Sequence, residues 1–210
     1  AWLNTEVVLL AELVVDRYVD ALTAAATGDR WLAEEVVDGD TEINERYLEL
    51  ERHCTDLIAL QQPVASDLRL ITASFKIITD LERVGDLATN LAARTRAGQE
   101  GIHPAVDIET LGGDAAAMVE AAIEAYEAAD PEACRTVAER DDDLDAACDG
   151  ATRRIIRSLL AETDVDRAAA RTAASRGFLT VRDIERVGDH AVNIAARSLY
   201  MIDGSDELLY

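Results

Sequence analysis

The amino-acid sequence predicts an all-α protein built from two tandem, homologous three-helix bundles. Helix-forming residues dominate the 210 positions, aromatic residues make up 4 % and there are only three prolines, as is typical of long helices. The chain also contains an internal repeat, because Asp80–Arg94 and Asp183–Arg197 are identical at eleven of fifteen positions and lie 103 residues apart. A repeat of that length favours two homologous units, related by a pseudo-two-fold axis, over one large domain.

Three helices are expected in the first unit, which we place at residues 1–97. Apolar residues recur at the spacing of one helix face over three stretches, at about 3–27, 30–60 and 67–95. Gly28 ends the first helix, and Asp29 and Ser66 are placed to cap the second and the third. Pro63 separates the last two helices, because the residue before a proline is pushed out of the helical region.

A linker at 98–107, where glycines and a proline concentrate, leads to the second unit at 108–210. Its helices are expected at about 108–128, at 131–161 behind an Asp130 cap, and from Thr163 or Asp164 to 202. The offset between the units is 101 at Asp29 and Asp130 but 103 at the repeated motif. The two extra residues are assigned to the turn before the last helix, since an insertion inside a helix would rotate its apolar face.

Each copy of the motif sets a Glu, an Asp and an Asn four residues apart. On an α-helix this spacing places two carboxylates and an amide along one gently drifting strip beside the apolar face. The residues are Glu82, Asp86 and Asn90 in the first copy, and Glu185, Asp189 and Asn193 in the second. Carboxylates at a helix interface need partners, because unpaired burial of a charge is costly.

A glycine lies inside each motif helix, and more acids lie on the helix before it. Gly85 and its counterpart Gly188 each cost about 1 kcal/mol relative to alanine, which predicts a close approach by a neighbouring helix, or by ions and water held between helices. The acids that antiparallel packing could bring opposite the motif are Asp40 in the first unit, and Asp141 and Asp145 in the second. Asn44 stands where the second unit has Asp145, so the two sites are expected to differ.

Oxygen ligands without His or Cys suit hard divalent ions such as Mg²⁺ or Mn²⁺, and iron at carboxylate-bridged multinuclear sites. Two other readings stay open. The acids could be solvated surface groups paired with Arg83 and Arg186, in a purely structural helical interaction module. They could also serve a carboxylate-bridged metalloenzyme, although the one Glu-x-x-His spacing, which ends at His103, falls in the linker. His190 is expected at the core edge or in solvent rather than as a ligand.

The formal net charge is −22, the sequence pI is about 4.3 and Lys76 is the only lysine. Such a surface indicates adaptation to high salt in a halophilic organism, and it argues against binding nucleic acid or docking unaided on an anionic membrane. Three cysteines without a CxxC spacing are expected to be reduced and buried, as in a cytoplasmic protein. No stretch is apolar enough for a transmembrane helix or a signal peptide.

The segment Gln61–Ile71, followed by Leu81–Asp86, resembles the most characteristic part of the PhoU family of phosphate-uptake regulators, and the Glu-x-x-x-Asp motif of that family occurs here twice. The resemblance implies a non-enzymatic, cytoplasmic protein, often a homodimer. Such a protein represses the phosphate ABC transporter. It also silences the phosphate-starvation response by acting with a sensor kinase, a transcriptional regulator or another signalling partner.

The same resemblance implies metal sites at the two motif faces. Members of the family carry Mg²⁺ or Mn²⁺ in some cases and multinuclear iron or zinc clusters in others. Carried over to this sequence, the resemblance nominates Glu82, Asp86, Glu185 and Asp189 first, and then Asn90, Asn193, Asp40, Asp141 and Asp145. The sequence therefore predicts a metal-binding negative regulator of phosphate uptake.

Overall fold

The structure is a computed structural model that describes residues 2–98, 102–161 and 167–209. These residues form six α-helices. In chain order they are α1 (Trp2–Thr27), α2 (Arg30–Gln61), α3 (Ala65–Arg96), α4 (Ile108–Ala128), α5 (Pro131–Ala161) and α6 (Arg167–Asp203). The prediction of an all-α protein with two homologous three-helix units is confirmed, while the unit boundaries at 97 and 108 stay a prediction.

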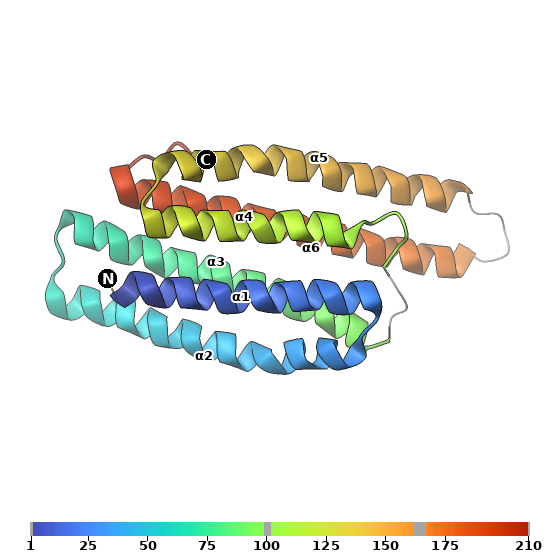
Figure 1. The fold of residues 1–210 in the computed structure, drawn as a ribbon, viewed down its shortest axis with the longest axis horizontal. Helices are drawn as coiled ribbons and strands as arrows, with labels where there is room; N and C mark the ends of the chain where they lie inside the picture. The colour runs from blue at the N-terminus through green and yellow to red at the C-terminus, as the bar shows by residue number, and fades with distance from the viewer. Residues whose placement is uncertain (1, 99–101, 162–166, 210) are drawn as a thin grey trace.

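The two units lie side by side, and each contributes two helices to their contact (Figure 1). Helix α3 packs against α6 and runs in the opposite direction, and α1 packs against α4. The other two helices lie outside, since among the six helices α2 contacts only α1 and α3, and α5 contacts only α4 and α6. Buried apolar residues from both units form one continuous cluster, so the two bundles share a single core.

A buried polar contact ties the units together inside this core. The hydroxyl of Tyr126 on α4 lies 2.7 Å from the Ser74 hydroxyl on α3 and 3.3 Å from Asn4 Oδ1 on α1. Burial raises the pKa of Tyr126 to about 12. Because the phenol oxygen has partners in two other helices, its burial is compensated.

The first residues of the helices test the predicted capping residues. Asp29 Oδ1 accepts from Trp31 N at 3.0 Å and from Leu32 N at 3.1 Å, and Asp130 caps α5 in the same way. Both capping predictions are confirmed. The prediction of a Ser66 cap was wrong: Val64 precedes α3 in an extended conformation, without a side-chain cap, and its carbonyl already accepts the first helical hydrogen bonds. The predicted start of α6 at Thr163 or Asp164 lies outside the described residues.

Two neighbouring glycines in α4 give a prediction on stability. A Cβ on Gly112 would overlap the buried Leu22 side chain of α1, whereas a Cβ on Gly113 would meet nothing within 4 Å. We expect Gly112→Ala to lower the free energy of unfolding by about 1–2 kcal/mol through overpacking. Gly113→Ala should raise it by about 1 kcal/mol through helix propensity. Urea denaturation of both variants measures the difference, and equal stabilisation by both would contradict the close contact.

Within the described residues, no helix is both long and apolar enough to cross a membrane.

Candidate metal sites

Each motif helix turns its carboxylate strip toward the helix that precedes it in the chain. A Cβ on Gly85 would lie 3.3 Å from two atoms of Ile43 on α2, and a Cβ on Gly188 would lie 2.6 Å from Leu144 Cδ2 on α5. Ile43 and Leu144 hold equivalent places in the repeat. The glycines therefore let α2 and α5 approach the motif backbone closely, which confirms the predicted approach by a neighbouring helix.

In the first unit, the carboxylates accept hydrogen bonds or lie beside an arginine. Asp40 on α2 accepts from Asn44 Nδ2 at 2.9 Å through Oδ2 and from Thr89 Oγ1 at 3.0 Å through Oδ1. On α3, Arg83 Nε lies 3.6 Å from Glu82 Oε2, and Arg83 Nη1 lies 3.5 Å from Asp86 Oδ2. The first site thus has neutral donors and one positive charge among its three acids.

These three acids are close enough to repel each other. Partial burial raises the pKa of Glu82, and the Asp86 carboxylate raises it further. Partial burial also raises the pKa of Asp86, followed by the charge of Asp40 on the other helix. Arg83 opposes both shifts without cancelling them. The Glu82 side chain is 20 % exposed and that of Asp86 is 42 % exposed, so these acids are interacting carboxylates at the partly solvent-exposed edge of the α2–α3 interface.

In the second unit, four acids meet without such compensation. Asp141 and Asp145 lie on α5 opposite Glu185 and Asp189 on α6, and burial followed by the charges of Asp145 and Asp189 raises the pKa of Asp141 to about 6. Asp141 Oδ1 is buried and has no hydrogen-bond partner in the described part of the chain. It faces the glycine, because a Cβ on Gly188 would lie 3.1 Å from it.

Two more acids of this second site, Asp145 and Glu185, are exposed at its rim. Slight burial raises the pKa of Asp145, and the Asp189 carboxylate adds to the shift. Slight burial likewise raises the pKa of Glu185, followed by the charge of Asp145. Over residues 2–98, 102–161 and 167–209, no basic side chain forms an ion pair with any of the four. The second site consequently has the stronger need for a cation.

The donor set fits a hard divalent ion. The second site offers only carboxylate oxygens, one of them a buried acceptor without a partner, and such ligands suit Mg²⁺ or Mn²⁺. In the part of the chain that the structure describes, no three His, Cys, Asp or Glu side chains already converge as a metal site. Binding would therefore require the side chains to turn toward one another, which a cation favours by relieving their repulsion.

The structure does not bring the two motif asparagines to these acids. Asn90 is exposed on α3, and Asn193 Nδ2 lies 3.4 Å from Asp80 Oδ1 across the α3–α6 contact. Eight residues rotate a helix position by roughly 80°, which accounts for this divergence. His190 lies on the same contact, with Nδ1 2.9 Å from Asp80 Oδ1, at the core edge as expected.

Sequence reasoning predicted that Asn44 would distinguish the first site, where it donates to Asp40, but it missed Thr89. Thr89 hydrogen-bonds Asp40, and its counterpart in the second motif is Val192. This is one of only four positions at which the two motif copies differ, so comparing the copies position by position could have found it. The predicted pairing of Arg83 with motif acids is confirmed, because Arg83 lies beside both Glu82 and Asp86.

Comparison with known proteins gives matches over nearly the whole chain. The sequence matches the PhoU domain over residues 7–95 and 108–198. It is 32 % identical over 206 residues to a phosphate-specific transport system accessory protein PhoU homolog of Pseudomonas putida, covering 97 % of this chain and 78 % of the relative. It is 29 % identical over 208 residues to the Escherichia coli (strain K12) accessory protein PhoU, with coverages of 97 % and 83 %.

Two solved structures have the same architecture. The crystal structure of PhoU from Pseudomonas aeruginosa superposes with a TM-score of 0.88 at 30 % identity, covering 97 % of this chain and 96 % of that one. The phosphate transport system regulatory protein PhoU from Streptococcus pneumoniae superposes with a TM-score of 0.84 at 23 % identity, with coverages of 97 % and 94 %, and supports the fold alone. The two segments matched by sequence coincide with the α1–α3 and α4–α6 units.

Proposed function

Because the chain belongs to the PhoU family, we propose that it is a metal-binding negative regulator of phosphate uptake and phosphate-starvation signalling. The names of its relatives, accessory proteins of the phosphate-specific transport system, support the transport part. The observation that carries the metal part is the buried oxygen of Asp141, which lacks a partner among the described residues and lies within four mutually repelling carboxylates.

The proposed regulator works in the cytoplasm as a homodimer, through contact with components of the phosphate ABC transporter and with a sensor kinase or a transcriptional regulator. Exposed apolar side chains support a role in protein contacts. Leu60 and Val64 project at the α2–α3 end, and Leu160 projects at the corresponding end of α5. Because the chain carries a net charge of −22, an anionic membrane surface repels it. The proposed regulator therefore reaches the membrane by binding a protein partner.

The residues proposed to hold a cation lie on facing helices in each unit. They are Asp40, Glu82 and Asp86 between α2 and α3, and Asp141, Asp145, Glu185 and Asp189 between α5 and α6. A bound divalent ion supplies positive charge that neutralises the repulsion among these oxygens. Because the ligands come from two helices, occupancy fixes the position of α5 relative to α6, which gives the regulator a surface whose shape depends on the metal.

One set of variants tests both parts of the proposal. The test variant neutralises the four motif acids, as Glu82→Gln/Asp86→Asn/Glu185→Gln/Asp189→Asn. The control neutralises four exposed acids in the groove between α1 and α4, as Glu12→Gln/Asp16→Asn/Glu120→Gln/Glu124→Gln. The control matches the change in charge and leaves the motif faces intact.

Elemental analysis and Mn²⁺ titration should show binding by the wild type and the control and its loss in the test variant. At about 100 times the dissociation constant, the ion should stabilise the folded wild type by about 2.7 kcal/mol. In a deletion strain, phosphate uptake should rise, and the wild type and the control should restore repression while the test variant does not. Identical metal binding by all three proteins would refute the metal part, and unchanged uptake after deletion would refute the regulator.

The same experiment separates the two alternatives. Turnover of oxygen or of phosphoesters by the metal-loaded wild type would favour a carboxylate-bridged metalloenzyme. Unchanged phosphate uptake and gene expression after deletion would favour a purely structural helical module.

A further inference from the structure

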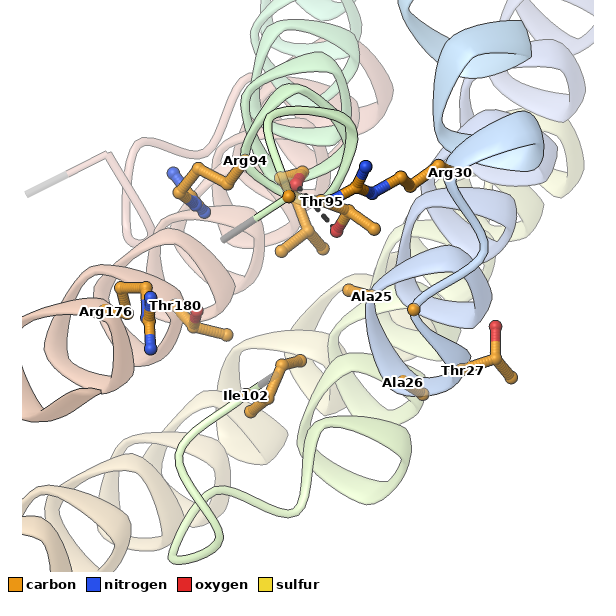
Figure 2. Close-up of a pocket in the computed structure, with 12 residues that line it drawn as sticks. Ala25, Ala26, Thr27, Arg30, Arg94, Thr95, Ile102, Arg176 and Thr180 are labelled. Atoms are coloured by element: carbon orange, nitrogen blue, oxygen red, sulfur yellow. Dashed lines mark hydrogen bonds between the residues drawn. The ribbon is translucent and has the colours of Figure 1, made fainter. Parts of the chain in front are cut away.

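A pocket of about 390 Å³ lies at the end of α3, where the linker leaves the first unit, and none of the motif acids lines it. Its walls come from the end of α1, the start of α2, the end of α3, the linker at Gly98 and Ile102, and the first half of α6 (Figure 2). Although the chain has 42 acidic and 20 basic residues, Arg30, Arg94 and Arg176 line this pocket, and none of its described lining residues is an Asp or a Glu. The pocket is therefore a positively charged site on a strongly acidic protein.

One of the three arginines is fixed in place by an ion pair. Arg94 Nη2 donates to Asp183 Oδ2 at 2.7 Å, and the second oxygen of Asp183 accepts from Arg182 Nη2 at 3.1 Å. A guanidinium carries five N–H donors in a rigid plane, so this contact leaves others for the pocket. Asp183 thus acts as a positioning residue that orients Arg94.

The other two arginines lack a partner in the described part of the chain. No hydrogen bond or ion pair is formed by Arg30 or Arg176, and Arg176 Nε is buried. Figure 2 shows Arg30 extending from the start of α2 toward Thr95, with Arg94 and Arg176 on the opposite side of the pocket. Arginines without a carboxylate, in a chain with twice as many acids as bases, indicate a place for an external anion.

Hydroxyl groups complete the polar lining. Thr180 lies one helical turn after Arg176 on α6, is largely buried and lines the pocket. Thr95 lines it from α3, where its hydroxyl donates to Leu91 O at 3.4 Å. Arginine N–H groups and hydroxyl donors together are the groups that proteins use to bind tetrahedral oxyanions, and the flat guanidinium can hold two oxygens of a phosphate group at once.

The pocket is not a by-product of the repeat. Arg30 corresponds to Pro131 in the second unit, and Arg176 corresponds to Ala73 in the first. Of the three arginines, only Arg94 has a basic counterpart in the other unit. The other two charges belong to this end of the molecule alone, so the duplicated fold by itself does not require them.

We propose that this pocket binds a phosphate-group anion, either orthophosphate or a short phosphate chain, between Arg30, Arg94 and Arg176. The anion is held by α2 and α3 of one unit and by α6 of the other, so its binding favours one relative arrangement of the two units. The suggestion that this anion signals the phosphate supply of the cell rests on the proposed function. The proposal that the pocket binds the anion does not depend on it.

Isothermal titration calorimetry of the purified full chain, at fixed ionic strength, tests the proposal. The probes are sodium orthophosphate and sodium tripolyphosphate, and the variants are Arg30→Gln and Arg176→Gln. Arg52→Gln is the matched control, because it removes one positive charge from an exposed site on α2, about 33 Å along the helix from Arg30. Arg94 is left intact because its ion pair with Asp183 stabilises the fold.

We expect saturable binding by the wild type and by Arg52→Gln, and affinity weaker by about tenfold or more in each pocket variant, since each loses a charge-assisted contact. Tighter binding of orthophosphate would assign the site to free phosphate, and tighter binding of tripolyphosphate to a phosphate chain. No saturable binding of either anion, or equal affinities of all variants, would overturn the proposal. Because no transporter or metal is involved, this failure would leave the proposed regulator untouched, and unchanged uptake in the deletion strain would leave the anion site untouched.

Discussion

Replacing Asp183 by alanine is expected to lower the free energy of unfolding by about 3 kcal/mol. Asp183 is 6 % exposed and joins α6 to α3 through Arg94 Nη2 at 2.7 Å. Removing one partner of a buried ion pair costs about 3–5 kcal/mol, because the other charge stays behind without compensation. The lower end applies here, since the Arg94 side chain is 21 % exposed and regains some hydration. Urea denaturation monitored by circular dichroism measures the change.

An exposed ion pair serves as the control. Arg17 Nη2 and Glu42 Oε2 lie 3.4 Å apart between α1 and α2, with the Glu42 side chain 47 % exposed. Glu42→Ala should change the free energy of unfolding by less than about 1 kcal/mol, because water and salt screen the pair. If Asp183→Ala destabilised the protein no more than Glu42→Ala, the Arg94–Asp183 pair would have no special place in the contact between the units.

The helices could be predicted from the sequence because their signals are local. Asp29 and Asp130 are followed by apolar residues at helical spacing, and both cap a helix as that pattern indicates. The capping prediction for Ser66 was wrong although serine is a good capping residue. Val64, in an extended conformation after Pro63, is the residue from which α3 begins, and Ser66 already lies inside the helix. Local propensity predicted the helix there, while the conformation of the preceding turn set its first residue.

The contact between the units could not be predicted from either repeat alone. An apolar stripe shows which face of a helix is buried but not which helix covers it. The pairing of α3 with α6 is visible only in the structure, where Arg94 meets Asp183 and His190 meets Asp80. These partners are about a hundred residues apart in the sequence, and no local spacing connects them.

The candidate sites were predictable to the extent that the chain repeats itself. Duplication of the Glu-x-x-x-Asp spacing indicated both carboxylate faces, and the structure places Asp40 and Asp141 opposite them. The arginine pocket gave no such signal, because Arg30 and Arg176 lie 146 residues apart on different helices. Only the packing of one unit against the other brings them to the same cavity.

The second carboxylate site should make the metal-free protein less stable as the pH rises. The pKa of Asp141 is raised from its ordinary value of 3.8 to about 6 by burial and by the neighbouring carboxylates. The folded state therefore binds this proton more tightly than the unfolded state does. The stability from Asp141 is fully present below about pH 4 and is lost as the pH rises to about 6. In EDTA, we expect the wild type to lose about 1–2 kcal/mol over this interval, after discounting for solvent exposure.

Asp141→Asn removes the charge and keeps the shape, so in EDTA it should raise the free energy of unfolding by about 1–2 kcal/mol at pH 7 and change it little at pH 4. Glu139→Gln, an equal charge change at an exposed position of the same helix, should leave the pH dependence as it is. At pH 7, saturating Mn²⁺ should make the wild type more stable than Asp141→Asn, because the wild type gains binding energy that the variant has lost.

Denaturation curves at both pH values, with and without Mn²⁺, measure these differences in the free energy of unfolding. If Asp141→Asn were less stable than the wild type in EDTA at pH 7, Asp141 would be a satisfied structural residue and not a carboxylate held ready for a cation.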